Sequence, residues 1–243
     1  MTLFEGDRSG GGRRWPWNQD HHSSRLRMVE DQIRRRGVTD PLVLEAIAAV
    51  PRHLFVPADQ QSASYGDHAL PIGFGQTISQ PFIVALMTAA LEPQPGLRVL
   101  EVGTGSGYQA AVLGACGMEV YSVERIPELF EVARVNLETS GCGLHVRLRL
   151  ADGSRGWADE APFERILITA AAASVPHAIA GQLAVGGVLV APVGDPYLQT
   201  IYRYRKRADG SLEAEALEGA RFVPLITEED DDGEAAPADT DDA

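Results

Sequence analysis

Hydrophobic residues along this chain follow two alternating spacings, the three-to-four residue period of helices and the short continuous runs of buried strands. Two helical segments come first and are separated near Gly37 and Pro41. From residue 97 onward the two patterns alternate. Strands are predicted at 97–102, 118–123, 144–150, 164–169, 187–192, 198–206 and 212–224, and helices at 107–115, 127–140 and 175–184. This succession predicts an α/β fold in which a mostly parallel sheet is covered on both faces.

A different pattern occupies residues 65–81, which are rich in glycine, proline and polar side chains. Such a segment is typical of an ordered loop over a site and not of a core element. At its end, Ser79 or Gln80 can cap a helix that has Pro81 at its first position and continues through Leu91.

Length and charge indicate the domain organisation. Residues 23–227 are long enough for one compact domain, whereas 1–22 lack periodicity and 228–243 are strongly acidic, so we expect both ends to be disordered. Without the nine acids of the C-terminal tail, 25 acidic residues face 21 basic ones, and the formal net charge falls from −13 to −4. This mild charge argues against a nucleic acid as the main partner.

The cysteines and the apolar segments argue against several further classes of protein. Cys116 and Cys142 give neither a disulfide framework nor a metal-ligand spacing, and we expect no metal. The N-terminus lacks the apolar stretch of a signal peptide, and the longest apolar tract, 166–194, is interrupted by glycine, proline and polar residues. We therefore expect a cytoplasmic protein without a membrane partner.

Candidate chemistry begins with V-L-E-V-G-T-G-S-G-Y-Q (99–109), an apolar strand that runs into a glycine-rich turn and then a helix. Glycines allow positive φ and let backbone N–H groups approach a ligand. The spacing lacks the third glycine of the dinucleotide pattern G-x-G-x-x-G. Glu101, just before the turn, is either the partner of a backbone amide or a counter-charge for the amino group of a ligand. The pattern favours S-adenosylmethionine, which carries such an amino group.

Acidic residues also follow the next two predicted strands. Glu124, 21 residues after Gly103, can accept hydrogen bonds from both ribose hydroxyls, or it can be a surface residue paired with Arg125. Asp152 can accept a hydrogen bond from an adenine amino group, or it can form an ordinary turn with Gly153. Together with the glycine turn, these residues predict one nucleoside pocket.

The glycine turn occurs together with five further motifs. In chain order these are M-V-E-D-Q-I-R-R-R-G-V-T-D-P (28–41), V-P-R-H-L-F-V-P (50–57), L-P-I-G-F-G-Q-T-I-S-Q-P (70–81), P-F-E-R-I-L-I-T-A-A (162–171) and R-F-V-P-L (221–225). Over roughly residues 25–226 the chain therefore closely resembles the protein-L-isoaspartate (D-aspartate) O-methyltransferases. The glycine turn is shared by most methyltransferases, whereas G-Q-T-I-S-Q-P is specific to this family.

The resemblance implies a doubly wound, Rossmann-like fold of the S-adenosylmethionine-dependent methyltransferases, with a mostly parallel seven-stranded sheet and extra N-terminal helices. It also implies a reaction in which S-adenosylmethionine donates a methyl group to the free α-carboxylate of an L-isoaspartyl residue. The ester then collapses to a succinimide, which opens partly to normal aspartate. The partners would be isoaspartyl-containing proteins and peptides, and we expect a monomer.

By the same resemblance, Ser79 is the active-site serine, although the N-cap of the next helix is its other possible role. The expected substrate-binding residues are Thr77, Ile78, Gln80, Phe222 and Val223. The expected cofactor-binding residues are Glu101, Gly103, Thr104, Gly105, Gly107, Glu124, Arg125, Asp152 and Gly153. His53 is interpreted as packed or hydrogen-bonded, because the reaction needs no general base.

Two other functions stay open. A methyltransferase of the same fold could esterify a normal aspartate in a dedicated precursor peptide. A non-catalytic binding module could retain the fold, and its signature would be an eroded cofactor turn or a missing Ser79, neither of which is seen.

Overall fold

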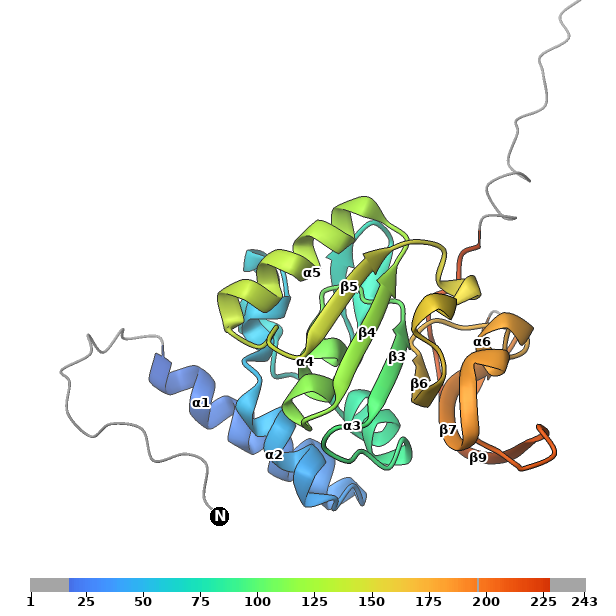
Figure 1. Ribbon diagram of the computed structural model, residues 1–243. Coiled ribbons are helices and arrows are strands. Elements are labelled where there is room, and N and C mark those ends of the chain that lie inside the picture. Colours follow the sequence, from blue (N-terminus) through green and yellow to red (C-terminus); the bar gives the residue numbers. More distant parts are fainter. Residues whose placement is uncertain (1–17, 196, 228–243) are drawn as a thin grey trace, which may run out of the picture.

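A seven-stranded sheet forms the centre of the computed structural model, which describes residues 18–195 and 197–227 (Figure 1). Its strands are β3 (Arg98–Val102), β4 (Glu119–Glu124), β5 (Val146–Leu150), β6 (Phe163–Ile168), β7 (Leu183–Gly194), β8 (Gln199–Lys206) and β9 (Leu212–Ala220). Their order is β5-β4-β3-β6-β7-β8-β9, with parallel neighbours from β5 to β7. Strand β8 is antiparallel to both of its neighbours, β7 and β9. The prediction of a mostly parallel seven-stranded sheet is confirmed.

Helices cover the sheet unequally. Within the described residues the α-helices are α1 (Asn18–Arg27), α2 (Pro41–Ala49), α3 (Pro81–Ala90), α4 (Tyr108–Ala115), α5 (Pro127–Ser140) and α6 (His177–Gln182), and a π-helix, Met28–Ile33, follows α1. Successive side chains of a strand point to opposite faces. Val99 of β3 therefore joins the apolar cluster that includes α2, α3, α4 and α5, whereas Leu100 joins the cluster of the short α6. The expected covering of both faces is confirmed.

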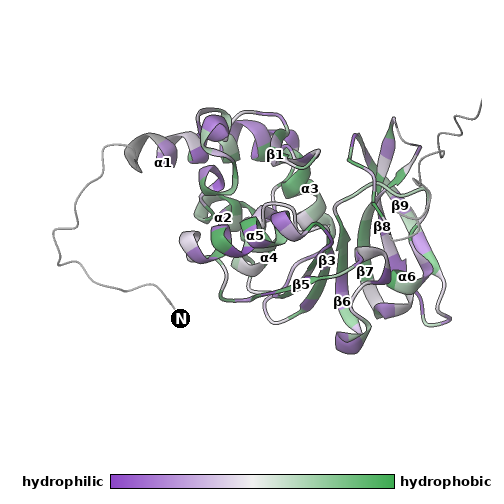
Figure 2. Cartoon of the chain, turned by 90° about the horizontal axis from the view of Figure 1, so that it is seen from above, coloured by the Kyte–Doolittle hydropathy of each residue, from purple (hydrophilic) through white to green (hydrophobic). Residues whose placement is uncertain are grey.

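The central strands are hydrophobic on both faces. Figure 2 shows hydrophobic residues along β3, β6 and β7, and nearly all side chains of β3 and β6 are buried. Such continuous apolar runs are expected where helices cover both faces of a parallel sheet. Across residues 18–195 and 197–227, none of the helices has the length and apolarity needed to cross a membrane.

The segment predicted as a loop, residues 65–81, instead contains a small antiparallel hairpin. Its strands are β1 (Leu70–Gly73) and β2 (Gln76–Ile78). The hairpin forms because Leu70, Ile72 and Ile78 are buried on one side while intervening residues face solvent. The connecting turn places Phe74 and Gly75 at positive φ, a conformation that glycine tolerates best.

Three boundaries differ from the expected ones by four residues or more. Strand β7 begins at Leu183, four residues before the expected start at 187. Helix α1 begins at Asn18, so a helix occupies the last five residues of the segment 1–22 that we expected to be disordered. Residues 1–17 and the acidic tail 228–243 lie outside the described residues. Strand β9 ends at Ala220, before the predicted end, because the next segment leaves the sheet. There, the N–H of Leu225 donates to the carbonyl of Ala171 at 2.7 Å.

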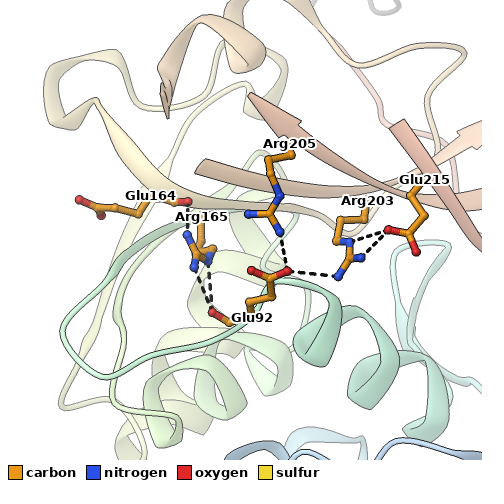
Figure 3. A network of polar contacts seen from close by, with 6 residues as sticks. All are labelled: Glu92, Glu164, Arg165, Arg203, Arg205 and Glu215. Atoms are coloured by element: carbon orange, nitrogen blue, oxygen red, sulfur yellow. Dashed lines mark hydrogen bonds and ion pairs between the residues drawn. The ribbon is translucent and has the colours of Figure 1, made fainter. Parts of the chain in front are cut away.

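The C-terminal end of α3 is joined to β8 by a polar network (Figure 3). The Glu92 carboxylate pairs with Arg203 at 3.2 Å and with Arg205 at 2.6 Å. The carbonyl of Glu92 accepts hydrogen bonds from the guanidinium of Arg165, a residue that is only 8% exposed. These contacts fix the C-terminal end of α3, whereas the hairpin precedes its N-terminal end.

Candidate active site

Three adjoining cavities open at the carboxyl ends of β3, β4 and β6. The first, of about 570 Å³, follows the end of β4; the second, of about 450 Å³, reaches Ser79; the third, of about 690 Å³, lies between Ser79 and residues 219–223. Thr77 and Thr169 line all three, so the cavities form one cleft. The chain proceeds from β3 to β4 and β5 on one side and returns to β6 on the other, and open α/β sheets bind ligands at such a reversal.

The glycines of the turn have different positions. Gly103 and Gly105 line both the first and the second cavity. A Cβ atom on Gly103 would lie 2.5 Å from the Thr169 hydroxyl, which donates to the carbonyl of Gly103 at 2.6 Å. Gly107, in contrast, is the N-cap residue of α4, with φ 87°, and packs against Ala133 of α5. Gly107 is not among the residues that line the cleft, so the structure supports a packing role for it.

Glu124 lies where the sequence predicts it, at the end of β4 and in the wall of the first cavity. Its side chain is 5% exposed. Oε2 accepts a hydrogen bond from the N–H of Gly105 at 2.8 Å, and Oε1 accepts from the N–H groups of Arg125 and Ile126 at 2.9 and 3.0 Å. The carboxylate therefore connects β4 to the glycine turn.

Glu101 is fully buried and does not line the cleft. Its Oε2 accepts a hydrogen bond from the Ser122 hydroxyl at 2.5 Å, and that hydroxyl lies 2.6 Å from the hydroxyl of Thr104, which lines the second cavity. Oε1 is buried and has no partner within the described residues. Burial raises the pKa of Glu101 to about 8. Glu101 thus acts on the cleft only through Ser122 and Thr104, and its partner is a hydroxyl and not a backbone amide.

The two predicted adenine residues, Asp152 and Gly153, differ in their relation to the cleft. Gly153 lines the first cavity, as does Arg125, another predicted cofactor-binding residue. Asp152 is 8% exposed and caps a short 3-10 turn, with Oδ1 accepting from the N–H of Ser154 at 2.8 Å. A Cβ atom on Gly153 would lie 2.7 Å from the Val102 side chain, so only glycine fits at this end of the cleft without movement.

Ser79 lines the second and third cavities. It is not the N-cap of α3, because Gln80 occupies that position, and no side chain caps the helix. In the described part of the chain the Ser79 hydroxyl makes no hydrogen bond, while the Ser79 carbonyl accepts one from Arg52 at 2.8 Å. Ile78 lines the second cavity and Gln80 the third. The capping role is thus excluded, and the hydroxyl remains available to a ligand.

The segment after β9 closes the other side of the cleft. Phe222 lines the second and third cavities, and Val223 lines the first and third. The N–H of Phe222 donates to the side-chain oxygen of the buried Gln199 at 2.8 Å. The carbonyl of Val223 accepts from the N–H of Ala171 at 2.8 Å. All five predicted substrate-binding residues therefore line this one cleft.

The sequence matches the family model of protein-L-isoaspartate(D-aspartate) O-methyltransferase over residues 23–230. The chain belongs to this family. It is 50% identical over 206 residues to the protein-L-isoaspartate O-methyltransferase of Stenotrophomonas maltophilia (strain K279a). The aligned region covers 84% of this chain and 91% of that relative. It is 52% identical over 203 residues to the namesake enzyme of Trichlorobacter lovleyi, with 84% and 93% covered.

A solved structure has a similar fold. A Plasmodium falciparum chain described as a protein-L-isoaspartate O-methyltransferase, in complex with S-adenosyl-L-homocysteine, superposes with a TM-score of 0.72 at 24% identity. The match covers 85% of this chain and 98% of the other. The predicted methyltransferase fold is confirmed.

The isoaspartate methyltransferase fold also brings residues to the cleft that sequence reasoning missed. Thr169 follows β6 within the motif I-L-I-T-A-A and lines all three cavities. Tyr108, the first residue of α4, lines the second cavity beside Ser79. Their signal is positional, since Thr169 follows a predicted parallel strand and Tyr108 follows the last glycine of the turn.

His53 lies outside the residues that line the cleft. Its Nδ1 is 2.7 Å from the Tyr65 hydroxyl, and its ring stacks on that of His21 with 4.1 Å between centroids. Burial, with a smaller effect from the neighbouring His21 and Arg25, lowers the pKa of His53 to about 4. The interpretation of His53 as a hydrogen-bonded residue is confirmed.

Proposed function

We propose that this protein is a repair methyltransferase that transfers a methyl group from S-adenosylmethionine to the free carboxylate of L-isoaspartyl residues in damaged proteins and peptides. Its membership of the family supports this activity. The structural observation that carries it is that Ser79, with a free hydroxyl, and the glycine turn line the same cavity. A methyl donor and a carboxylate acceptor can therefore meet there.

The donor side of the cleft fits S-adenosylmethionine. When bound, this cofactor supplies an electrophilic methyl group attached to a positively charged sulfur. Gly103 and Gly105 place backbone in the cavity wall without Cβ atoms, which lets a ligand approach closely. The Oε2 atom of Glu124 accepts one hydrogen bond and can accept another from a ribose hydroxyl. Gly153 leaves the space that a flat base requires.

The acceptor side needs placement more than proton transfer. A carboxyl group with an ordinary pKa near ~4 is already ionised at neutral pH, so the step needs no strong general base. The transfer requires in-line attack on the sulfur–methyl bond by a carboxylate that has lost water without being neutralised. The Ser79 hydroxyl can donate a hydrogen bond that orients this carboxylate. Thr77, at the junction of all three cavities, lies between the donor and acceptor sides.

Substrate recognition through the peptide backbone suits an enzyme whose clients share only the damaged residue. Phe222 and Val223 lie along the third cavity with Gln80, next to Ser79. Backbone groups of this segment can pair with an extended peptide, as strands do. We assign these residues, together with Thr77 and Ile78, to substrate binding.

The remaining assignments concern the whole chain. We propose that residues 23–227 form a single methyltransferase domain that acts as a cytoplasmic monomer, without a membrane or nucleic acid as partner. The mild charge of this part of the chain and its two unpaired cysteines support the proposal.

A paired-peptide assay tests the activity. The full chain is incubated with methyl-labelled S-adenosylmethionine and two peptides that differ only in an L-isoaspartyl or a normal aspartyl residue. We expect base-labile label on the isoaspartyl peptide alone. Label on the aspartyl peptide alone would favour the dedicated-precursor alternative, and no label on either would refute the proposed function.

A further inference from the structure

Arg52 is a fully buried arginine that contacts the main chain of Ser79. It belongs to the motif V-P-R-H-L-F-V-P and begins a 3-10 turn, Arg52–Phe55. Its side chain is 0% exposed. Nε donates to the carbonyl of Ser64 and Nη2 donates to the carbonyl of Ser79, each at 2.8 Å. One guanidinium thereby holds together two segments that are 15 residues apart in the chain.

The charge of Arg52 has no counter-ion. No carboxylate within the described residues pairs with it, and the groups that act on its pKa are the phenols of Tyr108 and Tyr65, which are uncharged at neutral pH. Nη1 is buried without a hydrogen-bond partner in the same part of the chain. Burial lowers the pKa of Arg52, but a guanidinium stays protonated in proteins. A buried charge of this kind opposes folding unless something compensates it.

The charge also lies directly behind the acceptor side of the cleft. The guanidinium carbon is 4.8 Å from the centroid of the Tyr108 ring, and Tyr108 and Ser79 both line the second cavity. A hydrogen bond to the Ser79 carbonyl polarises the peptide group between Ser79 and Gln80 and strengthens its N–H as a donor. A negatively charged ligand at Ser79 would gain from both effects.

We propose that Arg52 is a positioning residue for methyl transfer, whose guanidinium fixes the main chain of Ser79 and whose uncompensated charge favours binding of the substrate carboxylate beside it. This inference rests on the proposed function of Ser79. Because Arg52 acts from behind the peptide group, it attracts the carboxylate without pairing with its oxygens. No N–H group of Arg52 therefore occupies the oxygen lone pair with which the carboxylate attacks the methyl group.

Arg165 provides a matched control at the other end of the same helix. Like Arg52 it is a buried arginine, 8% exposed, and its guanidinium donates to a backbone carbonyl, that of Glu92 (Figure 3). Helix α3 thus has an arginine-bound carbonyl just before its start and another just after its end. Of the two, only Arg52 contacts residues that line the cleft, Ser79 and Tyr108. A purely structural role would give the two arginines similar effects, whereas a role in the cleft would be confined to Arg52.

The experiment compares Arg52→Met and Arg52→Lys with Arg165→Met in the full chain. For each variant we would measure the thermal unfolding midpoint, the Kd of S-adenosyl-L-homocysteine, and kcat and KM for an isoaspartyl peptide, per folded molecule. For Arg52→Met we expect an unchanged cofactor Kd, a KM raised about tenfold by loss of the charge and a kcat lowered on the order of 10²-fold by misplacement of Ser79. Arg52→Lys should restore KM, because it keeps the charge, but not kcat, because an ammonium lacks the planar fork that reaches both carbonyls.

These measurements distinguish a positioning role of Arg52 in methyl transfer from a purely structural role. Arg165→Met should lower the unfolding midpoint while kcat and KM stay within about twofold of the wild type. If Arg52→Met does not fold, Arg52→Lys alone tests the inference, which then requires a KM like that of the wild type together with a lowered kcat. Unchanged kcat in Arg52→Lys, or an equal loss of cofactor affinity and kcat in either Arg52 variant, would overturn the inference. An inactive wild-type chain would instead refute the proposed function, and this inference with it.

Discussion

The Oε2 atom of Glu124 accepts a hydrogen bond from the N–H of Gly105 at 2.8 Å, so the acid at the end of β4 shapes the glycine turn at the end of β3. The same carboxylate also lines the first cavity. One side chain thereby defines the backbone of the glycine turn and, in the proposed assignment, would present an acceptor to the ribose of the cofactor. Loss of Glu124 should therefore affect cofactor affinity and stability together.

Replacing Glu124 with alanine should weaken cofactor binding strongly. The ribose would lose an acceptor, and three N–H groups, of Gly105, Arg125 and Ile126, would lose their partner. We expect the Kd of S-adenosyl-L-homocysteine to rise on the order of 10²-fold, with a loss of about 2 kcal/mol in the free energy of unfolding. Calorimetric titration and urea unfolding measure the two effects.

Glu119, the exposed first residue of the same strand, is the matched control. Glu119→Ala should change neither quantity measurably. If Glu124→Ala bound the cofactor as tightly as the control does, the ribose assignment would be wrong and Glu124 would serve only the turn.

Replacing Ser79 with alanine should lower turnover and leave stability unchanged. The N-cap of α3 is Gln80, so removal of the Ser79 hydroxyl deletes no cap. Without a donor to orient the carboxylate, kcat for an isoaspartyl peptide should fall roughly 10- to 100-fold at saturating cofactor. Steady-state kinetics and thermal unfolding distinguish this from loss of a cap, which would cost about 1 kcal/mol.

Ser140, the last residue of α5, is the control for this substitution. Its hydroxyl donates to the carbonyl of Leu137, and neither residue lines the cleft. Ser140→Ala should retain full activity. A fully active Ser79→Ala would contradict the catalytic assignment of the serine.

The sequence predicted the elements whose signals are local. The strand β3, the glycine turn and α4 fall within residues 98–115, where an apolar run, three glycines and helical spacing follow one another. The hairpin at 70–78 was missed because glycine and proline mask the alternation of its few buried residues. The segment after Ala220 was predicted as strand because its apolar residues resemble one, although they pack beside residue 171.

The composition of the site depended on contacts between distant segments, which a single sequence does not reveal. Thr169 reaches the cleft because β6 pairs with β3, a matter of strand order. Glu101 was expected to contact the ligand. It lies within β3, beside Ser122 of β4, and its carboxylate accepts a hydrogen bond from the hydroxyl of that residue. Arg52 contacts Ser79 only because the chain folds back over 27 residues. Motifs thus identified the segments of the site more reliably than the direction of each side chain.

The network around Glu92 should contribute to stability without affecting catalysis (Figure 3). Glu92→Gln removes the charge that Arg203 and Arg205 share, leaving like charges side by side. Because all three side chains are partly exposed, solvent screens the pairs, and we expect a loss of only about 1 kcal/mol in the free energy of unfolding. Urea unfolding checks this value, with Glu138→Gln, which breaks a single, more exposed pair, as the control. Altered kcat or KM in Glu92→Gln would show that α3 transmits the change to Ser79.

The buried carboxyl of Glu101 should make the protein less stable as the pH rises. Burial raises the pKa of Glu101 from its ordinary value of 4.5 to about 8, so between these two pH values the folded state holds a proton that the unfolded state releases. The contribution of this proton is fully present below pH ~4.5, is lost progressively as the pH rises to ~8, and changes no further above it. Its total is on the order of a few kcal/mol.

Glu101→Gln isolates this contribution, because a glutamine oxygen can still accept from Ser122 while its amide group does not ionise. His53, with a pKa lowered to about 4, makes stability rise with pH up to ~6.5 in both proteins, so it cancels in their difference. We expect the difference in free energy of unfolding between variant and wild type to grow in favour of the variant from pH 5 to 8 in urea titrations. A difference that stays constant with pH would mean that Glu101 is already ionised at pH 5, and that Ser122 and its surroundings stabilise the charge.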